Sequence, residues 1–289
     1  MKKISSLNRR VIILGSSGYI GSSLKNYLKK KIKVIGIGRN KIDFLKKNSS
    51  KKLSSIIRHH DIIINAVAIA PCKNIQDLNK NIIIINNIQK GLKNKKIFKY
   101  LNISSDAVYP DSKKRITEKI TPDPVSIHGL MHYNREKIIN LSLDCKIVHV
   151  RPTLVYGYGD PHGGYGPNLF YKTVVNDNVI KLFGKGEEIR DHVYIDDLVF
   201  LISNIIFKNF KGIINIVTGN GITFKEIALD FKKNYKKIRI ISLKRTIPIP
   251  HNGYRLFNNR LIKKLFPNFK FNSFLKNLNL MIKCYNEKN

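Results

Sequence analysis

The chain has 289 residues, of which 43% are hydrophobic; this excludes a disordered protein and allows one large domain or two modest ones. Its formal net charge of +34 admits nucleic acid or another anionic surface as a partner. The lysines are scattered in pairs and triplets, with no arginine-rich stripe among aromatic residues, so we interpret the charge as a solvated surface and keep nucleic acid binding as an alternative function.

Short runs rich in isoleucine and valine alternate with longer amphipathic stretches through the first half of the chain. In chain order, the patterns predict a strand at 10–15, a helix at 22–30, strands at 33–38 and 61–68, a helix at 75–92, a strand at 99–105, a helix at 129–143 and a strand at 146–152. Such strands, separated by helices, are typical of a parallel sheet covered on both faces. The predicted fold class is therefore α/β, a doubly wound parallel sheet of the Rossmann type.

The pattern changes after residue 155, where a loop rich in glycine follows. Beyond this loop short strands and helices mix, and no linker or repeat separates them from the first half. We predict a dinucleotide-binding domain over residues 8–155, to which residues 191–216 return. A smaller, mixed substrate-binding region is predicted over residues 156–190 and 217–289.

The sequence GSSGYIG, residues 15–21, follows the first predicted strand and precedes the first predicted helix. Gly15 allows a tight turn, Gly18 lets the backbone approach a pyrophosphate, and Gly21 permits close packing of the helix on the sheet. The N-terminus of the helix then offers free N–H groups to the phosphates. The loop therefore predicts a dinucleotide site, formed by its three glycines together with Ser17, Tyr19 and Ile20.

The residues after the second predicted strand bear on the choice of cofactor. An acidic residue at this place would accept a hydrogen bond from the ribose 2′-hydroxyl of NAD. Here the strand ends in Gly38, Arg39 and Asn40. Because an arginine pairs with a 2′-phosphate, Arg39, with Asn40 beside it, favours NADP, and NAD is the alternative.

The cysteines and the N-terminus indicate the compartment. Cys72, Cys145 and Cys284 stand far apart, without the spacing of metal ligands, so we expect a reducing compartment and no metal site. The apolar run after the basic N-terminus is too short for a signal peptide, and nothing approaches the roughly 20 apolar residues of a membrane span. The expected location is the cytoplasm, without a membrane partner.

Along nearly the whole chain, and in order, the motifs resemble those of the extended short-chain dehydrogenase/reductase family, the nucleotide-sugar epimerases, dehydratases and reductases. GSSGYIG resembles its glycine fingerprint, NAVA at 65–68 the small residues that pass under the cofactor, and SSDAVYP at 104–110 the strand that carries a catalytic serine or threonine. RPTLVYGYGD at 151–160 resembles the loop beside the nicotinamide, and segments at 167–170, 184–199, 215–228 and 254–259 continue the match. Each motif is modest alone, and their collinearity is the specific signal.

The resemblance implies roles for individual residues. Ser105 would be the catalytic serine. The diphosphate of a nucleotide-linked sugar would contact Asn168, Arg190 and Arg255. Beyond the glycine loop, the cofactor would contact Ala66, Val67, Ala68, Asn81, Ser104, Pro152 and Thr153.

The chain departs from the family at the centre of its chemistry. The family pattern is a tyrosine, a glycine, a lysine four residues after the tyrosine, and a glutamate four further on. In IHGLMHYNREK, residues 127–137, that register falls on His128, Gly129, His132 and Glu136. Pro124 and Ser126, ahead of His128, support the register.

Tyr133 and Lys137 form a competing pair with the bare four-residue spacing. Residues four apart share a helix face, whereas His128 and Tyr133, five apart, lie roughly 140° apart around the axis. One site can therefore hardly use both pairs. Tyr133 lacks the following glycine, so we expect Tyr133 to pack and Lys137 to be solvated.

Histidines suit proton exchange with a sugar hydroxyl or carbonyl, because their ordinary pKa of about 6.5 needs no neighbouring cation to be useful at neutral pH. We predict that His128 and His132, with Ser105, are catalytic in hydride exchange between a nicotinamide and a nucleotide-linked sugar. Arg39 favours a reductase that consumes NADPH, whereas tightly held NAD would favour an epimerase or dehydratase. The main alternative is a catalytically silent, NADP(H)-binding regulator. The expected partner is the nucleotide sugar, with a homodimer as a candidate assembly.

Overall fold

The computed structural model describes residues 9–246 and 248–287. Residue 8, which begins the predicted dinucleotide-binding domain, and residues 247, 288 and 289 of the predicted substrate region lie outside the described part. The chain divides into two compact units. Unit 1 comprises the described residues up to Pro110, Glu118–Pro152 and Val199–Asn215, and unit 2 comprises Asp111–Thr117, Thr153–Leu198 and the described residues from Ile216 onward.

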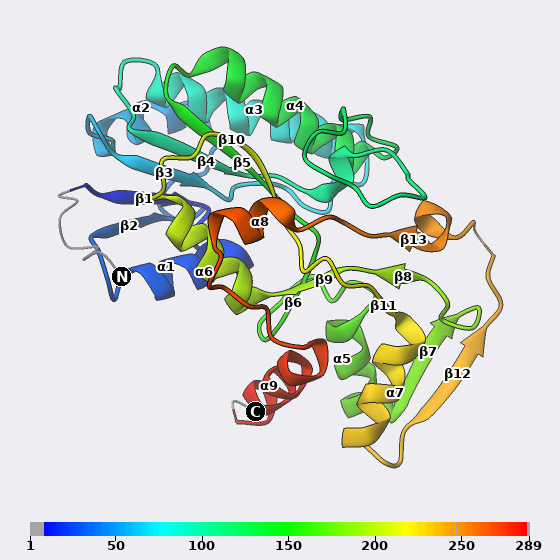
Figure 1. Ribbon diagram of the computed structural model, residues 1–289. Coiled ribbons are helices and arrows are strands. Elements are labelled where there is room, and N and C mark those ends of the chain that lie inside the picture. The colour runs from blue at the N-terminus through cyan, green and yellow to red at the C-terminus, as the bar shows by residue number, and fades with distance from the viewer. Residues whose placement is uncertain (1–8, 247, 288–289) are drawn as a thin grey trace. The chain divides into compact units, whose positions relative to one another are not determined.

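Unit 1 is built around a parallel sheet, which has six strands among the described residues (Figure 1). The strands are β1 (Val11–Leu14), β2 (Val34–Ile37), β3 (Ile62–Asn65), β4 (Lys99–Ile103), β5 (Lys146–Pro152) and β10 (Gly212–Ile216). They lie in the order β10-β5-β4-β3-β1-β2, and the pairs from β5 to β2 are parallel. The order changes direction between β1 and β3, which is where open α/β sheets bind ligands.

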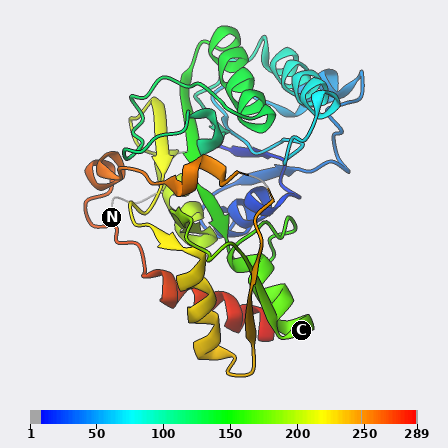
Figure 2. The same ribbon diagram turned by 90° about the vertical axis from the view of Figure 1, so that its right-hand side faces the viewer.

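Helices cover both faces of this sheet (Figures 1 and 2). On one face lie α2 (Ser49–Ile56), α3 (Ile75–Leu92) and α4 (Ile127–Ser142), and on the other lies α1 (Tyr19–Leu28). Cover on both sides is required because β1, with the sequence VIIL, and β3, with IIIN, are buried along their whole length. The predicted fold class, a doubly wound parallel sheet, is confirmed.

The predicted elements of the first half are all present; α3 and β5 have the predicted bounds, and the ends of the others are shifted. α1 begins at Tyr19 because the glycine turn leads directly into the helix, and α4 begins at Ile127 because the side chain of Ser126 accepts the N–H of Gly129 at 3.1 Å. α2 was not predicted. Its sequence, SSKKLSSI, has too few apolar residues to show a period, and Leu53 is its one fully buried apolar side chain.

Isoleucine fills most of the core of unit 1. Ile12 and Ile63 from the strands pack with Ile85 and Ile88 from α3, and all four are fully buried. Burial of each such side chain stabilises the fold by roughly 1.5–3 kcal/mol. This packing fixes the carboxyl ends of the strands, from which the candidate site residues follow.

Unit 2 consists of short strands and helices. One sheet has the order β11-β8-β13, and two further pairs are β12-β7 and β6-β9. These strands are β6 (Leu154–Tyr156), β7 (Val179–Phe183), β8 (Ile189–Arg190), β9 (His192–Tyr194), β11 (Ile222–Thr223), β12 (Arg239–Leu243) and β13 (Tyr254–Arg255). The helices are α5 (Pro167–Asp177), α7 (Phe224–Asn234), α8 (Arg260–Leu265) and α9 (Phe274–Asn286), and α6 (Ile195–Ile205) runs on from unit 2 into unit 1.

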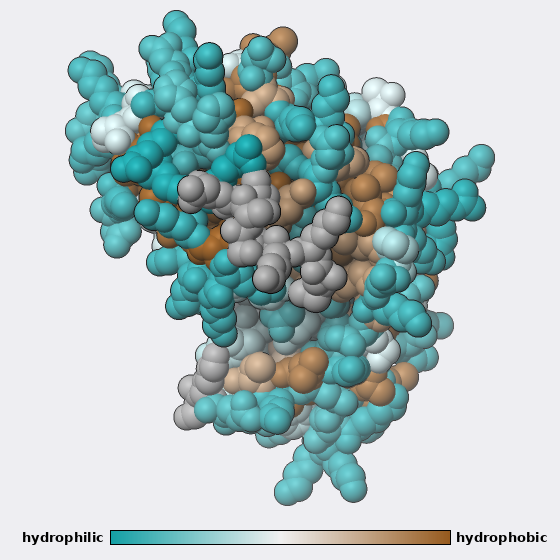
Figure 3. Space-filling model, turned by 60° about the vertical axis from the view of Figure 1, so that its left-hand side comes forward, coloured by the Kyte–Doolittle hydropathy of each residue, from teal (hydrophilic) through white to brown (hydrophobic). Residues whose placement is uncertain are grey.

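The surface seen in Figure 3 is mostly hydrophilic, in agreement with the high net charge of the sequence. Figure 3 shows one face of the molecule, on which hydrophilic residues cover most of the area and apolar patches are small. Within residues 9–246 and 248–287, no helix has the length and apolar character needed to cross a membrane.

Candidate active site

The turn between β1 and α1 requires glycine at two positions. Gly15 has a φ of +80°, and a Cβ on it would lie 2.8 Å from the carbonyl carbon of Ala66. A Cβ on Gly21 would lie 2.1 Å from the carbonyl oxygen of Gly15. The described residues provide neither a side-chain cap at Gly18 nor an acidic side chain in the first turn of α1. This N-terminus therefore suits an anionic ligand.

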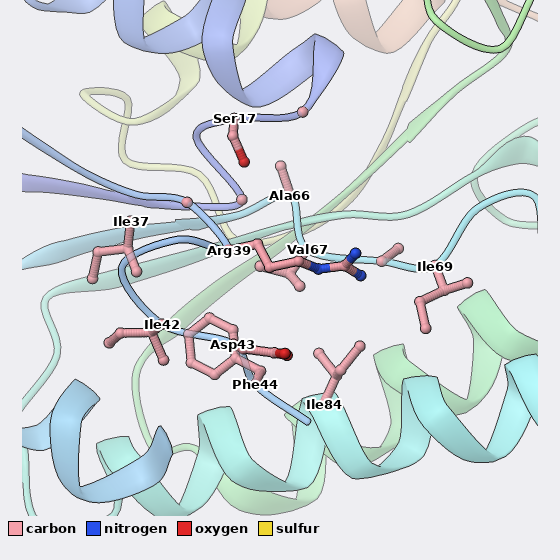
Figure 4. A pocket seen from close by; sticks show the side chains of 14 residues that line it. Ser17, Ile37, Arg39, Ile42, Asp43, Phe44, Ala66, Val67, Ile69 and Ile84 are labelled. Carbon is pink, nitrogen blue, oxygen red and sulfur yellow. The ribbon is translucent and has the colours of Figure 1, made fainter. Parts of the chain in front are cut away.

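A pocket opens beside this turn at the carboxyl ends of β1, β2 and β3 (Figure 4). Apolar side chains, among them Ile37, Ile42 and Phe44, line the part next to the segment after β2, and the glycine turn lines another part. Apolar walls suit an adenine ring and the turn suits a pyrophosphate, so the pocket fits a dinucleotide. Of the predicted cofactor residues, the pocket is lined by Gly15, Ser17, Gly18, Arg39, Ala66, Val67 and Ala68.

Two side chains of opposite charge reach into the pocket from the segment after β2 (Figure 4). They are the exposed Arg39 and the half-buried Asp43, whose Oδ1 accepts the N–H of Leu45 at 3.0 Å. A cation here suits a ribose 2′-phosphate, whereas a carboxylate suits a 2′-hydroxyl. The pocket therefore carries a group suited to either nicotinamide cofactor.

The segment after β3 forms one wall of the pocket and is held by two helices. Asn81 on α3 is buried, and its side-chain amide accepts the N–H of Ile69 at 2.9 Å and donates to the carbonyl of Ile69 at 3.1 Å. Arg135 on α4 donates to the carbonyl of Val67 at 2.8 Å. The side chain of Asn81 therefore supports the pocket wall by hydrogen bonds to the backbone of Ile69.

The same segment fixes one of the predicted histidines. The N–H of Cys72 donates to Nδ1 of His128 at 3.2 Å. The ring of His132 lies one helical turn further along α4, with its centroid 4.8 Å from that of His128 and its plane at 88°. Burial, together with the charge of Arg135 and the neighbouring His128, lowers the pKa of His132 well below its usual value. The two histidines thus lie together, and the surroundings of His132 favour the neutral imidazole.

The N-terminal part of α4 lies against the loop that carries Ser105. A Cβ on Gly129 would lie 2.0 Å from the carbonyl oxygen of Ala107, so this close approach requires glycine. Ser105 caps the short 3-10 helix η2 (Asp106–Val108), because its hydroxyl oxygen accepts the N–H of Ala107 at 3.1 Å. The packing of α4 on η2 therefore holds the Ser105 loop beside the helix of the histidines.

Ser104 belongs to a buried polar network. Its hydroxyl donates to Oε1 of Glu136 at 2.5 Å, and its N–H donates to the carbonyl of Val150 at 2.7 Å. Glu136 also forms a buried ion pair with Arg151, with 2.5 Å between Oε2 and the guanidinium. Burial alone would raise the pKa of Glu136, but the hydrogen bond and charge of Arg151 outweigh it and lower the pKa. The amide and hydroxyl of Ser104 are therefore engaged inside the fold.

The competing pair on α4 has a different environment. Lys137 is exposed, and its ammonium lies 5.2 Å from the ring centroid of the half-buried Tyr133. Such a contact is a surface cation–π interaction.

In unit 2, two of the predicted phosphate-binding residues lie side by side. Strand β13 pairs with β8 in parallel, and Arg255 stands opposite Arg190. Neighbouring strands are about 4.8 Å apart, so the two buried arginines form one cationic pair. Each arginine has a carboxylate neighbour. Nη2 of Arg190 lies 2.9 Å from Oε2 of Glu188, and Nη1 of Arg255 lies 3.6 Å from Oδ1 of Asp111.

Asn168, the third predicted substrate residue, is buried at the start of α5. Its side chain accepts the N–H of Gly157 at 3.1 Å and donates to the carbonyl of Gly157 at 2.6 Å. It also donates to the hydroxyl of Tyr285 at 3.2 Å. These contacts fix the loop after β6.

Several predicted cofactor residues lie outside the lining of the pocket: Tyr19, Ile20, Gly21, Asn40, Asn81, Ser104, Pro152 and Thr153. Thr153, for example, is buried in unit 2, where its hydroxyl donates to the carbonyl of Asp191 at 3.1 Å. Conversely, the lining includes residues that sequence reasoning missed: Ile37, Gly38, Ile42, Asp43, Phe44, Ile69 and Ile84. Most of these are apolar, and in a sequence they cannot be distinguished from core residues.

Arg135 was also missed. It is 2% exposed, so its charge is enclosed in the protein. One signal was available in the sequence, because Arg135 stands three residues after His132 and therefore on the same face of a predicted helix.

A doubly wound sheet with a dinucleotide pocket at its change of strand order defines a Rossmann-type nucleotide-binding protein. Residues 11–216 match the model of the NAD dependent epimerase/dehydratase family, and the chain belongs to this family. The family predicted from the motifs is thereby confirmed.

Relatives with named activities cover most of the chain. CDP-abequose synthase of Yersinia pseudotuberculosis is 27% identical over 240 residues, which are 75% of this chain and 82% of the relative. The dTDP-4-dehydro-6-deoxyglucose reductase of Escherichia coli is 25% identical over 266 residues, which are 79% of this chain and 83% of the relative. Both relatives are enzymes, and this supports the prediction that the chain is an enzyme.

Solved structures show the same fold over nearly the whole chain. The UDP-glucuronic acid 4-epimerase from Bacillus cereus, in complex with UDP-glucuronic acid and NAD, has a TM-score of 0.84 at 20% identity and covers 97% of this chain and 100% of its own. A GDP-L-fucose synthetase from Naegleria fowleri bound to NADP has a TM-score of 0.79 at 18% identity, with 97% and 93% covered.

Proposed function

We propose that the protein is an NAD(P)-dependent epimerase or reductase that acts on a nucleotide-linked sugar in the cytoplasm. The observation that carries this proposal is that the segment after β3 lines the dinucleotide pocket with residues 66–69 and, three residues further on, holds His128 through the N–H of Cys72. A bound nicotinamide supplies or accepts a hydride. The named relatives are enzymes of nucleotide-sugar chemistry, and this favours the enzyme over a silent regulator or a nucleic acid-binding protein.

The side chains of unit 1 divide the proton chemistry between them. Nδ1 of His128 accepts the N–H of Cys72, so a neutral His128 carries its proton on Nε2. In the free protein this atom offers a hydrogen bond to the reacting oxygen of the sugar. Transfer of a proton from Nε2 to that oxygen starts from the doubly protonated ring, after Nδ1 has released the N–H of Cys72, and it leaves the ring neutral with its proton on Nδ1. In the reverse direction the proton of the sugar hydroxyl returns to Nε2. The hydroxyl of Ser105 shares the hydrogen bond to the same oxygen. Asn81 and Arg135 keep the pocket wall in place meanwhile.

We predict that NADPH binds at least several-fold more tightly than NADH, because the guanidinium of Arg39 pairs with the 2′-phosphate. Calorimetric titration of both cofactors measures the ratio. Arg39→Ala should abolish the preference, and Asp43→Asn should increase it, since it removes the carboxylate that suits a 2′-hydroxyl. Equal affinities in the parent, or an unchanged ratio in Arg39→Ala, would remove the basis for NADP.

The diphosphate of the substrate is assigned to the cationic pair of unit 2, with Asn168 in support. We predict that Arg190→Ala raises the Kd for the preferred nucleotide sugar at least about tenfold, as loss of a charge-assisted contact to a phosphate implies. The ligand is found by titrating a panel of CDP-, dTDP-, GDP- and UDP-linked sugars and following nicotinamide absorbance. Lys185→Ala, an exposed cation in the same segment, is the matched control and should leave the Kd unchanged. Full affinity in Arg190→Ala would mean that the substrate class is wrong.

A further inference from the structure

Arg135 is a buried cation at the carboxyl ends of β3 and β4. Its guanidinium donates to the carbonyl of Val67 at 2.8 Å, to Oδ1 of Asn102 at 3.3 Å and to the carbonyl of Ile103 at 3.4 Å. These acceptors are all neutral. The neighbouring carboxylate, that of Glu136, is paired with Arg151. Within the described part of the chain Arg135 forms no ion pair and its hydrogen bonds go to neutral groups, which is a costly arrangement for a group with only a structural role.

Arg135 also contacts His132, one of the two predicted catalytic histidines of α4. Its Nη1 lies 3.3 Å from Nδ1 of His132. A guanidinium has donors only, so Nδ1 of His132 must be the acceptor, and the imidazole proton must be on Nε2. Protonation of Nδ1 would set two N–H groups and two positive charges against each other. The lowered pKa of His132, caused by burial and then by Arg135, agrees with this geometry.

The two imidazoles of α4 therefore receive a donor at the same atom. At His128 the donor to Nδ1 is the N–H of Cys72, and at His132 it is Arg135. Each neutral ring then carries its proton on Nε2. A ring in this state donates a hydrogen bond from Nε2 and cannot accept one there.

We propose that Arg135 is a positioning residue, which holds His132 in the neutral tautomer with the proton on Nε2, so that His132 serves as a hydrogen-bond donor to a sugar oxygen and not as a base. The proposal rests on the proposed function for the role of that donor in turnover. The tautomer itself is a property of the free protein, so it is measured without substrate or cofactor.

The first test is a two-bond ¹H–¹⁵N correlation spectrum of the full chain, labelled with ¹⁵N-histidine, at neutral pH. His132→Gln assigns the signals of His132 by their disappearance. We expect the Nε2–H tautomer in the parent and in Arg135→Lys, which retains a charged donor, and a mixture of tautomers in Arg135→Met, which has similar length but no donor. Lys137→Met removes an exposed cation from the same helix and should change nothing.

The parent spectrum is decisive by itself, even where Arg135→Met does not fold. An Nδ1–H tautomer or an imidazolium at His132 would overturn the proposal. So would an unchanged Nε2–H tautomer in a folded Arg135→Met.

The second test is a double-mutant cycle in kcat. If Arg135 acts through His132, Arg135→Met lowers kcat roughly tenfold in the parent but less than about twofold in the His132→Gln background. Equal losses in both backgrounds would show a purely structural role. If the expected tautomer is found but no nucleotide sugar is turned over, the proposed function fails and the assignment of the tautomer stands.

Discussion

His128→Ala is expected to lower kcat by about a hundredfold or more, the usual scale for removal of a general acid–base group. The imidazole is fixed at Nδ1 by the N–H of Cys72, so the alanine variant removes the Nε2 atom that exchanges the proton with the sugar oxygen. The affinity for NADPH should barely change, because His128 is not part of the lining of the pocket. Steady-state kinetics and a cofactor titration on the same preparation separate the two effects.

Tyr133→Phe is the matched control on the same helix. It removes only a hydroxyl from a half-buried ring beside the exposed ammonium of Lys137, so we expect activity within about twofold of the parent. The reverse pattern, an inactive Tyr133→Phe and an active His128→Ala, would show that the tyrosine–lysine spacing is the functional one and that the histidine register is wrong.

The elements that could be predicted from the sequence are those whose signals are local. The run VIIL at β1 and the glycines at 15 and 21 predict a buried strand and a tight turn, and both depend on residues next to one another in the chain. α2 has no such signal, because it is held by one buried leucine and by its packing on α3. Tertiary packing decides such an element, and periodicity cannot.

The site shows the same division. Arg190 and Arg255 come from strands far apart in the sequence, and the pairing of β8 with β13 brings them together. The family motifs predict these two residues, whereas their spacing in the sequence does not. For Arg135 the sequence is misleading in a different way. Its charge suggests a solvated position, yet its hydrogen bonds go to neutral acceptors in the segment after β3, in β4 and in His132. A buried arginine whose hydrogen bonds go to neutral groups cannot be recognised before the fold is known.

Glu136→Ala is expected to destabilise unit 1 by about 3–5 kcal/mol, because it leaves the guanidinium of Arg151 buried without its partner. The side chain of Arg151 is 1% exposed and that of Glu136 is 4% exposed, so water does not replace the lost contact. Ser104 also loses the acceptor of its hydroxyl. Urea unfolding at neutral pH, followed by circular dichroism, measures the loss, and Lys137→Ala, at the next and exposed position, should cost less than about 0.5 kcal/mol.

A double variant separates the cost of an unpaired charge from the cost of a lost attraction. Glu136→Leu with Arg151→Met replaces both partners by apolar side chains of similar length, and buried pairs replaced in this way often lose little stability. We therefore expect the double variant to be more stable than Glu136→Ala, although it has lost the same ion pair. If the double variant is as unstable as the single one, the pair itself contributes the stability. If Glu136→Ala loses less than about 1 kcal/mol, Arg151 finds another partner or water, and the buried ion pair contributes little to the stability of unit 1.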